Sequence, residues 1–83
     1  MVSVEIRYWA GAAAASGVES EAVTAGSVAD ALASVAATHG PDLQRILSVS
    51  SILVDGVRTG PAERGHDLMS PVQVEVLPPF AGG

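Results

Sequence analysis

The last six residues, Pro78-Pro79-Phe80-Ala81-Gly82-Gly83, form the segment of this chain best suited to chemistry. Two consecutive prolines offer no backbone N–H to a sheet and hold the chain extended, so they should end a strand and direct the chain outward. Gly82 and Gly83 have no side chains and the widest backbone freedom. We therefore predict that the two prolines stiffen the chain where it leaves the domain and that Phe80 is an apolar anchor. The two glycines should form a thin tip that ends in a carboxylate.

A carboxylate at such a tip can be activated by adenylation with ATP. Sulfide supplied by a persulfide can then displace AMP and leave a thiocarboxylate. To reach the α-phosphate the tip must thread a narrow channel, and a Cβ on either of its last two residues would widen it. Two terminal glycines are expected by chance in only about 1% of chains this rich in glycine. We therefore interpret the tail as functional rather than as an incidental disordered end.

Hydrophobic periodicity predicts the elements that carry this tail. Alternation of apolar and polar residues over Val2–Tyr8 indicates a strand with one buried face. The alanine-rich stretch Ala10–Gly17 is too short for a stable isolated helix, so we expect a flexible loop with at most one helical turn. A second strand is expected over Val18–Val23, with Glu19 and Glu21 facing solvent. The two strands should form a hairpin with a wide loop.

The central part of the chain predicts one main helix from about Val28 to His39. Ser27 is placed to cap its start, and Gly40 followed by Pro41 should end it. A short helical turn is expected to follow over Pro41–Leu47, bringing three apolar residues to the core: Leu43, Ile46 and Leu47.

Three further segments complete the pattern. Asp55-Gly56 between two apolar runs is a strong hairpin signal, so strands are expected over residues 52–54 and 57–59. Residues 60–67 are expected to form a polar loop. Alternation of Val72, Val74 and Val76 with polar residues predicts a final strand.

This order of elements indicates the α+β class. We predict a β-grasp (ubiquitin-like) fold: a mixed sheet of about five strands, with its first and last strands side by side and one main helix on one face. The domain should span residues 1–77, and residues 78–83 should form a flexible C-terminal Gly-Gly tail.

Composition excludes several classes of function. The net charge of the 83 residues is −5, and the four basic residues are scattered arginines, so no basic face for nucleic acid is expected. The acidic balance suits a partner with a basic docking site, or serves only solubility. There is no cysteine for disulfides and no apolar stretch long enough to cross a membrane, which favours a cytoplasmic protein. His39 and His66 lie far apart, so no metal site is expected.

Trp9, the only tryptophan, falls out of phase with the inward-facing residues of the first strand. It either belongs to a docking face or simply covers the edge of the sheet.

The tail resembles the Pro-Pro-x-x-Gly-Gly ending of the small subunit of molybdopterin synthase, in the MoaD/ThiS-like family of ubiquitin-like sulfur carriers. Three upstream segments are also similar to that family: Tyr8-Trp9-Ala10, Ser27–Leu32 and Val54-Asp55-Gly56. The chain departs from the family where Ala12–Ala15 replaces an Arg-Glu-Leu-type segment and where Ser70-Pro71 replaces Gly-Asp.

The resemblance implies that an E1-like enzyme, using ATP and Mg²⁺, adenylates Gly83, which then becomes a thiocarboxylate beside Gly82. It also implies that the large subunit of molybdopterin synthase receives the tail and uses its sulfur to convert cyclic pyranopterin monophosphate. Pro78, Pro79, Phe80 and Ala81 would be the partner-binding residues, with Phe80 as the anchor. This chain would bind no cofactor and would not be catalytic alone.

Three alternatives remain open at this stage. The chain could carry sulfur for another pathway, such as thiamin or cysteine synthesis. It could be a ubiquitin-like modifier that is conjugated to lysines of other proteins. It could also be a plain β-grasp binding module whose tail is incidental.

Overall fold

Five strands form a single mixed sheet in the order β2-β1-β5-β3-β4. The structure, a computed structural model, describes residues 1–79. Its elements in chain order are β1 (Val2–Tyr8), α1 (Ala10–Ser16), β2 (Ser20–Ala25), α2 (Val28–His39), α3 (Pro41–Val49), β3 (Ser51–Val54), β4 (Val57–Arg58), α4 (Pro61–Arg64) and β5 (Val72–Leu77).

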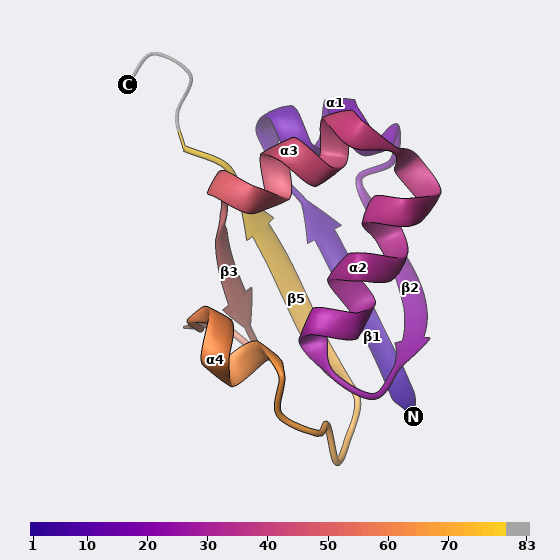
Figure 1. Cartoon of the computed structure of the whole chain (residues 1–83), viewed down its shortest axis with the longest axis vertical. Coiled ribbons are helices and arrows are strands. Elements are labelled where there is room, and N and C mark those ends of the chain that lie inside the picture. The colour runs from indigo at the N-terminus through magenta and orange to yellow at the C-terminus, as the bar shows by residue number, and fades with distance from the viewer. Residues whose placement is uncertain (80–83) are drawn as a thin grey trace.

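The first and last strands lie side by side in the middle of the sheet, as predicted (Figure 1). They run parallel, with Ile6 opposite Val74 and Tyr8 opposite Val76. β2 pairs with β1, and β3 pairs with β5, both in antiparallel fashion. This is the β-grasp arrangement expected from the sequence, and it puts the strand that leads into the tail at the centre of the sheet.

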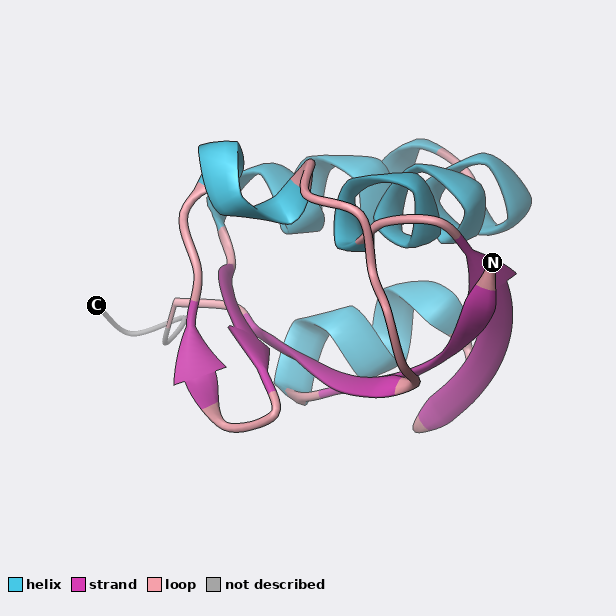
Figure 2. Ribbon diagram, turned by 90° about the horizontal axis from the view of Figure 1, so that it is seen from below, coloured by secondary structure: helices cyan, strands magenta, loops and turns pink. Residues whose placement is uncertain are grey.

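The core lies between the sheet and the helices. Alternation directs one face of each central strand inward, and this face includes the fully buried Ile6, Val74 and Ile52. α2 adds Val28, Ala31 and Val35 to the same cluster. Figure 2 shows the sheet curving beneath the helices. The opposite face of β1 and β5 carries exposed polar residues such as Glu5 and Gln73.

The main helix begins and ends where the sequence predicted. The Ser27 hydroxyl accepts a hydrogen bond of 3.1 Å from the backbone N–H of Asp30, which satisfies one free donor of the first turn. Gly40 follows His39 with a φ of 97°, a conformation that favours glycine. Pro41 then occupies the first turn of α3, where its missing N–H is not needed. α3 is a nine-residue helix, longer than the predicted turn.

The hairpin at Asp55-Gly56 is also confirmed. Both residues have positive φ, 49° and 82°, as a tight two-residue connection between β3 and β4 requires. The backbone N–H of Asp55 donates to the carbonyl of Gln73. This contact ties the hairpin to β5.

Two predicted loops contain helices. Ala10–Ser16 forms α1 rather than a loop, because Ala12 is fully buried and the helix packs against α3. Gly17, with a φ of 79°, ends α1. The predicted loop at 60–67 contains α4, a single turn in which the Glu63 side chain accepts from the backbone N–H of Gly60. Tertiary packing and local capping outweigh the short length of these segments.

The second strand is shifted by two residues from the prediction, and one of its side chains faces the other way. β2 begins at Ser20, and Glu21 lies opposite Ile6 on the helix-covered face of the sheet. Glu21 is therefore half-buried rather than directed to solvent as predicted, whereas Glu19 is exposed. None of the helices within residues 1–79 is long and apolar enough to cross a bilayer.

Candidate functional site

The C-terminal tail leaves the domain from its central strand. β5 ends at Leu77, which pairs with Ser51 of β3. Figure 1 shows β5 running between β1 and β3 toward the end of the sheet where α1 and α3 lie. Pro78 is half-buried and Pro79 is exposed. Because neither proline has an N–H to extend the ladder, the sheet stops here and the chain turns outward.

Of the site residues predicted from the sequence, the structure describes Pro78 and Pro79. Phe80, Ala81, Gly82 and Gly83 lie outside the described residues. The structure therefore describes the base of the predicted site, and the role of its tip stays a prediction.

A groove of about 620 Å³ opens beside this exit, and we call it the tail-base groove. It is formed by the end of β1 and start of α1, the junction of α3 and β3, and the exit segment. Its lining residues are Trp9, Ala10, Gly11, Val49, Ser51, Leu77, Pro78 and Pro79. None of these side chains is ionisable, so they can hold an apolar group but supply no general acid or base, and the Ser51 hydroxyl has no basic side chain among them to activate it.

Trp9 has the largest side chain of the groove, and two side-chain contacts and one backbone hydrogen bond hold it in place. Its indole Nε1 donates a hydrogen bond of 3.0 Å to Glu75 Oε2. The guanidinium carbon of Arg7 lies 4.6 Å from its ring centroid, within range of a cation–π contact. Its backbone N–H donates to the carbonyl of Val76. Trp9 thus remains 40% exposed while being fixed at the base of the tail.

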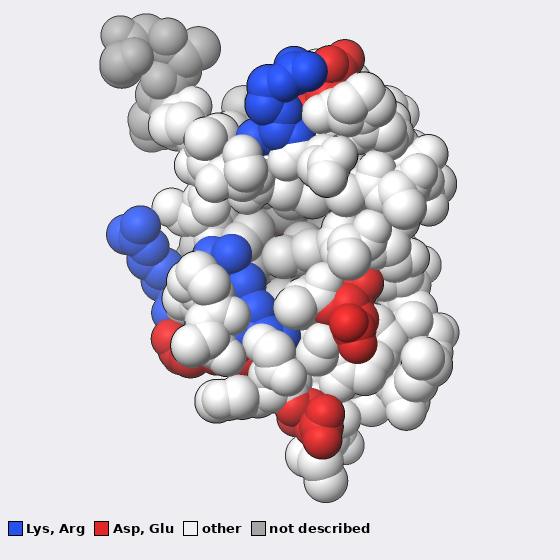
Figure 3. All heavy atoms as spheres, in the orientation of Figure 1, with Lys and Arg blue, Asp and Glu red and all other residues white. Residues whose placement is uncertain are grey.

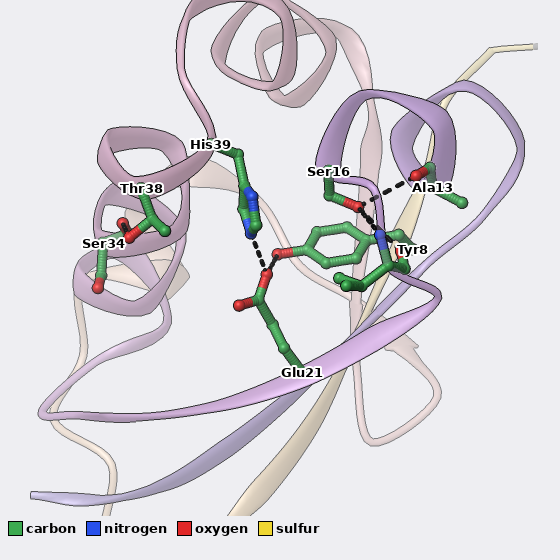
Figure 4. Close-up of polar contacts among 8 residues, drawn as sticks. Tyr8, Ala13, Ser16, Glu21, Ser34, Thr38 and His39 are labelled. Carbon is green, nitrogen blue, oxygen red and sulfur yellow. Dashed lines mark hydrogen bonds and ion pairs between the residues drawn. The ribbon is translucent and has the colours of Figure 1, made fainter.

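A polar cluster that the sequence interpretation missed lies between β1, β2 and α2 (Figure 4). The hydroxyl of Tyr8 donates to Glu21 Oε2 at 2.7 Å, and His39 Nε2 lies 2.5 Å from the same oxygen. The rings of Tyr8 and His39 meet edge to face, 6.3 Å apart. Burial of Tyr8, reinforced by the hydrogen bond to Glu21 and its charge, raises the pKa of Tyr8 far above its usual range.

The cluster is a structural clamp. It joins the last residue of α2 to β2 and to the end of β1, and it is separate from the tail-base groove. His39, the last residue of α2, thus has a close polar partner in Glu21. A signal for this was present in the sequence, because Glu21 is in phase with Val23 and Ala25, both of which face the helices.

The charge distribution does not form a basic docking surface on the face shown in Figure 3, where most side chains are neutral and basic groups lie beside acidic ones. Arg45, for example, is paired with Asp42 at 3.3 Å, and both are exposed. His66 is exposed after α4. Within residues 1–79, no three side chains of the metal-binding types lie close enough to hold an ion.

No protein-family model matches the chain, and no curated protein matches it in sequence. Solved structures do match. Small archaeal modifier protein 1 (SAMP1) from Methanosarcina acetivorans has a TM-score of 0.83 at 20% identity, covering 100% of this chain and 98% of that chain. SAMP1 from Haloferax volcanii has a TM-score of 0.80 at 23% identity, covering 98% and 99%. A chain of the complex of subunits 1 and 2 of the molybdopterin-converting factor from Helicobacter pylori has a TM-score of 0.69 at 20% identity, covering 98% and 99%.

These likenesses establish that the chain has the ubiquitin-like β-grasp fold over its described length. The resemblance to the small subunit of molybdopterin synthase is thereby confirmed at the level of the fold. The same fold occurs in proteins named as modifiers and in proteins named as molybdopterin-converting factors.

Proposed function

We propose that this chain, with its ubiquitin-like β-grasp fold, carries sulfur on the C-terminal carboxylate of Gly83. An E1-like enzyme transfers AMP from ATP to that carboxylate, with Mg²⁺, and releases pyrophosphate. A persulfide sulfur then displaces AMP, and reduction of the resulting bond by a thiol leaves the thiocarboxylate. The large subunit of molybdopterin synthase receives the tail and takes the sulfur for dithiolene formation.

The observation that carries the proposal is the position of the tail's base. The tail starts from the central strand, which is fixed by ladders on both sides, and passes through Pro78 and Pro79 before its glycines. A rigid base and a thin tip allow a partner to hold the domain while the carboxylate enters a deep site. Six extended residues span at most about 20 Å, which suits an active site well below a partner's surface.

The lining of the tail-base groove supports a carrier rather than an independent enzyme. Its side chains are hydrocarbon apart from the indole N–H of Trp9 and the hydroxyl of Ser51. The indole N–H is already committed to Glu75. The catalytic groups for adenylation and sulfur transfer therefore come from the partners in this proposal.

Molybdopterin synthesis is the favoured destination of the sulfur, because the Pro78-Pro79 ending resembles that branch of the carriers. The structural neighbour from Helicobacter pylori is in complex with a subunit 2, which supports a large-subunit partner here. Capture of host proteins by the thiocarboxylate form distinguishes this pathway from thiamin or cysteine synthesis. Recovery of an enzyme of either other pathway, without a synthase large subunit, would redirect the proposal.

A second candidate is a ubiquitin-like modifier, favoured by the structural neighbours named as small archaeal modifiers. In that case the activated Gly83 forms an isopeptide with a lysine of another protein. The chain has no lysine of its own, so lysine-linked chains of this protein are excluded. Detection by mass spectrometry of Gly83-linked lysines in host extracts would support this candidate.

The experiment that tests the carrier proposal is deletion of Gly83. The shortened chain should lose thiocarboxylate formation, while its urea midpoint and circular dichroism match the full chain, because the core cluster is formed by residues between Val2 and Val76. Met69→Ala is a matched control, since Met69 is 90% exposed in the segment before β5. Sulfur carried by the shortened chain at the rate of the full chain would contradict the proposal.

A further inference from the structure

The tail-base groove is an apolar surface at the point where the described chain ends. Val49, the last residue of α3, is 63% exposed on one side of it, and Trp9 is 40% exposed on another. Pro78 and Pro79 complete its rim. Two further lining residues, Ala10 and Gly11, present at most a methyl group, so the groove of about 620 Å³ has room for a larger side chain.

The next residue along the chain supplies such a side chain. Phe80 follows Pro79 directly and is the only phenylalanine. Consecutive Cα atoms are about 3.8 Å apart, so the aromatic ring of Phe80 starts within reach of the groove. Of the residues beyond Pro79, Ala81 carries a methyl group and the two glycines carry nothing. Phe80 is therefore the one side chain of the tail that can fill this space.

We infer that in the free protein the ring of Phe80 packs into the tail-base groove against Trp9 and Val49. Two features favour it over an occupant from another molecule. The link through Pro79 gives Phe80 a very high effective concentration at the groove. Trp9 is already fixed by Glu75 and Arg7, so packing an aromatic ring against it requires little further ordering.

The docked ring divides the tail into an anchored base and a free tip. Ala81, Gly82 and Gly83 extend beyond the groove and stay available to an enzyme, while Phe80 is shielded. A partner that uses Phe80 as its own anchor must compete with the groove. Its apparent association constant is the intrinsic one multiplied by the fraction of molecules in which Phe80 is undocked. This inference concerns the free chain and does not depend on whether Gly83 carries sulfur.

The single Trp9 and the single Phe80 make the contact directly observable by NMR. In the full chain we expect nuclear Overhauser cross-peaks between the Phe80 ring protons and those of the Trp9 indole and the Val49 methyls. In Phe80→Ala, acrylamide quenching of Trp9 fluorescence should rise roughly twofold as the indole loses its cover. Ala81→Ser is the matched control and should leave the quenching unchanged.

A second variant tests the groove without altering the tail. Val49→Glu places a carboxylate at the groove wall, so it should abolish the Phe80–Trp9 cross-peaks while the folded spectrum is retained. The inference is overturned if the full chain shows no such cross-peaks and Phe80→Ala quenches like the parent. Shielding of Trp9 that increases with protein concentration would also overturn it, by assigning the groove to a second copy of the chain.

Discussion

The indole Nε1 of Trp9 donates a 3.0 Å hydrogen bond to Glu75 Oε2 across 66 positions of sequence. Glu75 lies on β5, three residues before Pro78, so the bond links the end of β1 to the strand that carries the tail. Because β1 and β5 are parallel neighbours, this link reinforces the ladder where the sheet ends. The orientation of Trp9 and the direction of the tail are thus set by the same pair of strands.

Removing the acceptor of this bond should loosen Trp9 without unfolding the domain. In Glu75→Ala we expect acrylamide quenching of Trp9 to increase, while the free energy of unfolding changes by less than about 1 kcal/mol because the bond is exposed. Glu75→Gln keeps an acceptor oxygen at the same distance and serves as the control. Equal quenching in both variants and the parent would show that Glu75 does not hold the indole.

Cutting back a core residue of β3 should cost far more stability than cutting back an exposed residue of β4. Ile52 is fully buried against the central strands, whereas Val57 is 64% exposed. Ile52→Ala should lower the free energy of unfolding by about 2–5 kcal/mol, and Val57→Ala by about 0.5 kcal/mol or less. Urea unfolding of both variants checks this. Equal losses of unfolding free energy in the two variants would contradict the assignment of Ile52 to the core.

Stability should fall in alkaline solution because of Tyr8. Burial, and then the Glu21 hydrogen bond and charge, raise the pKa of Tyr8 in the folded state. The unfolded state ionises near pH 10 and so binds fewer protons than the folded state above that pH. Unfolding free energy should therefore drop by about 1.4 kcal/mol per pH unit above pH 10.

The alkaline loss can be assigned to one residue because the chain has one tyrosine, no lysine and no cysteine. Tyr8→Phe should remove the slope between pH 10 and 11 in urea titrations. The stability of that variant at pH 7 will be lower, because Glu21 loses a donor. An undiminished alkaline slope in Tyr8→Phe would refute the assignment.

Tyr8 and Glu21 should be energetically coupled. Glu21→Ala leaves the buried hydroxyl of Tyr8 without its partner, at an expected cost of about 1–3 kcal/mol. Tyr8→Phe in that background should then cost less than it does alone. A double-mutant cycle measured by urea unfolding should give a coupling of at least about 0.5 kcal/mol. Additive losses would mean that the hydrogen bond contributes nothing net.

Elements with local signals were predictable from the sequence. α2 has a capping serine, a helical apolar stripe and a Gly-Pro stop, so both of its ends were predicted as they occur. The Asp55-Gly56 hairpin and β5 follow from turn chemistry and alternation. The start of the tail at Pro78 was predictable as well, because two consecutive prolines cannot extend the ladder of β5.

Features that depend on distant contacts were not predictable in the same way. α1 is a helix because Ala12 is buried and α3 packs on it. The seven residues of α1 cannot by themselves reveal either contact. Glu21 faces inward because Tyr8 and His39, far away in the sequence, supply its hydrogen-bonding partners. The tail-base groove likewise requires three chain segments to meet. Periodicity describes one segment at a time, so it misses α1 and the groove. For Glu21 it indicates the inward face, through Val23 and Ala25, but not the partners that this carboxylate finds there.

The central claim is that Gly83 carries sulfur, and intact-mass measurement tests it most directly. The protein is incubated with ATP, a sulfur source and the adenylating enzyme of its host. We expect a mass gain that matches one oxygen replaced by sulfur, localised to Gly83 by fragmentation. An unchanged mass, with the same enzyme shown to be active on another carrier, would contradict the claim.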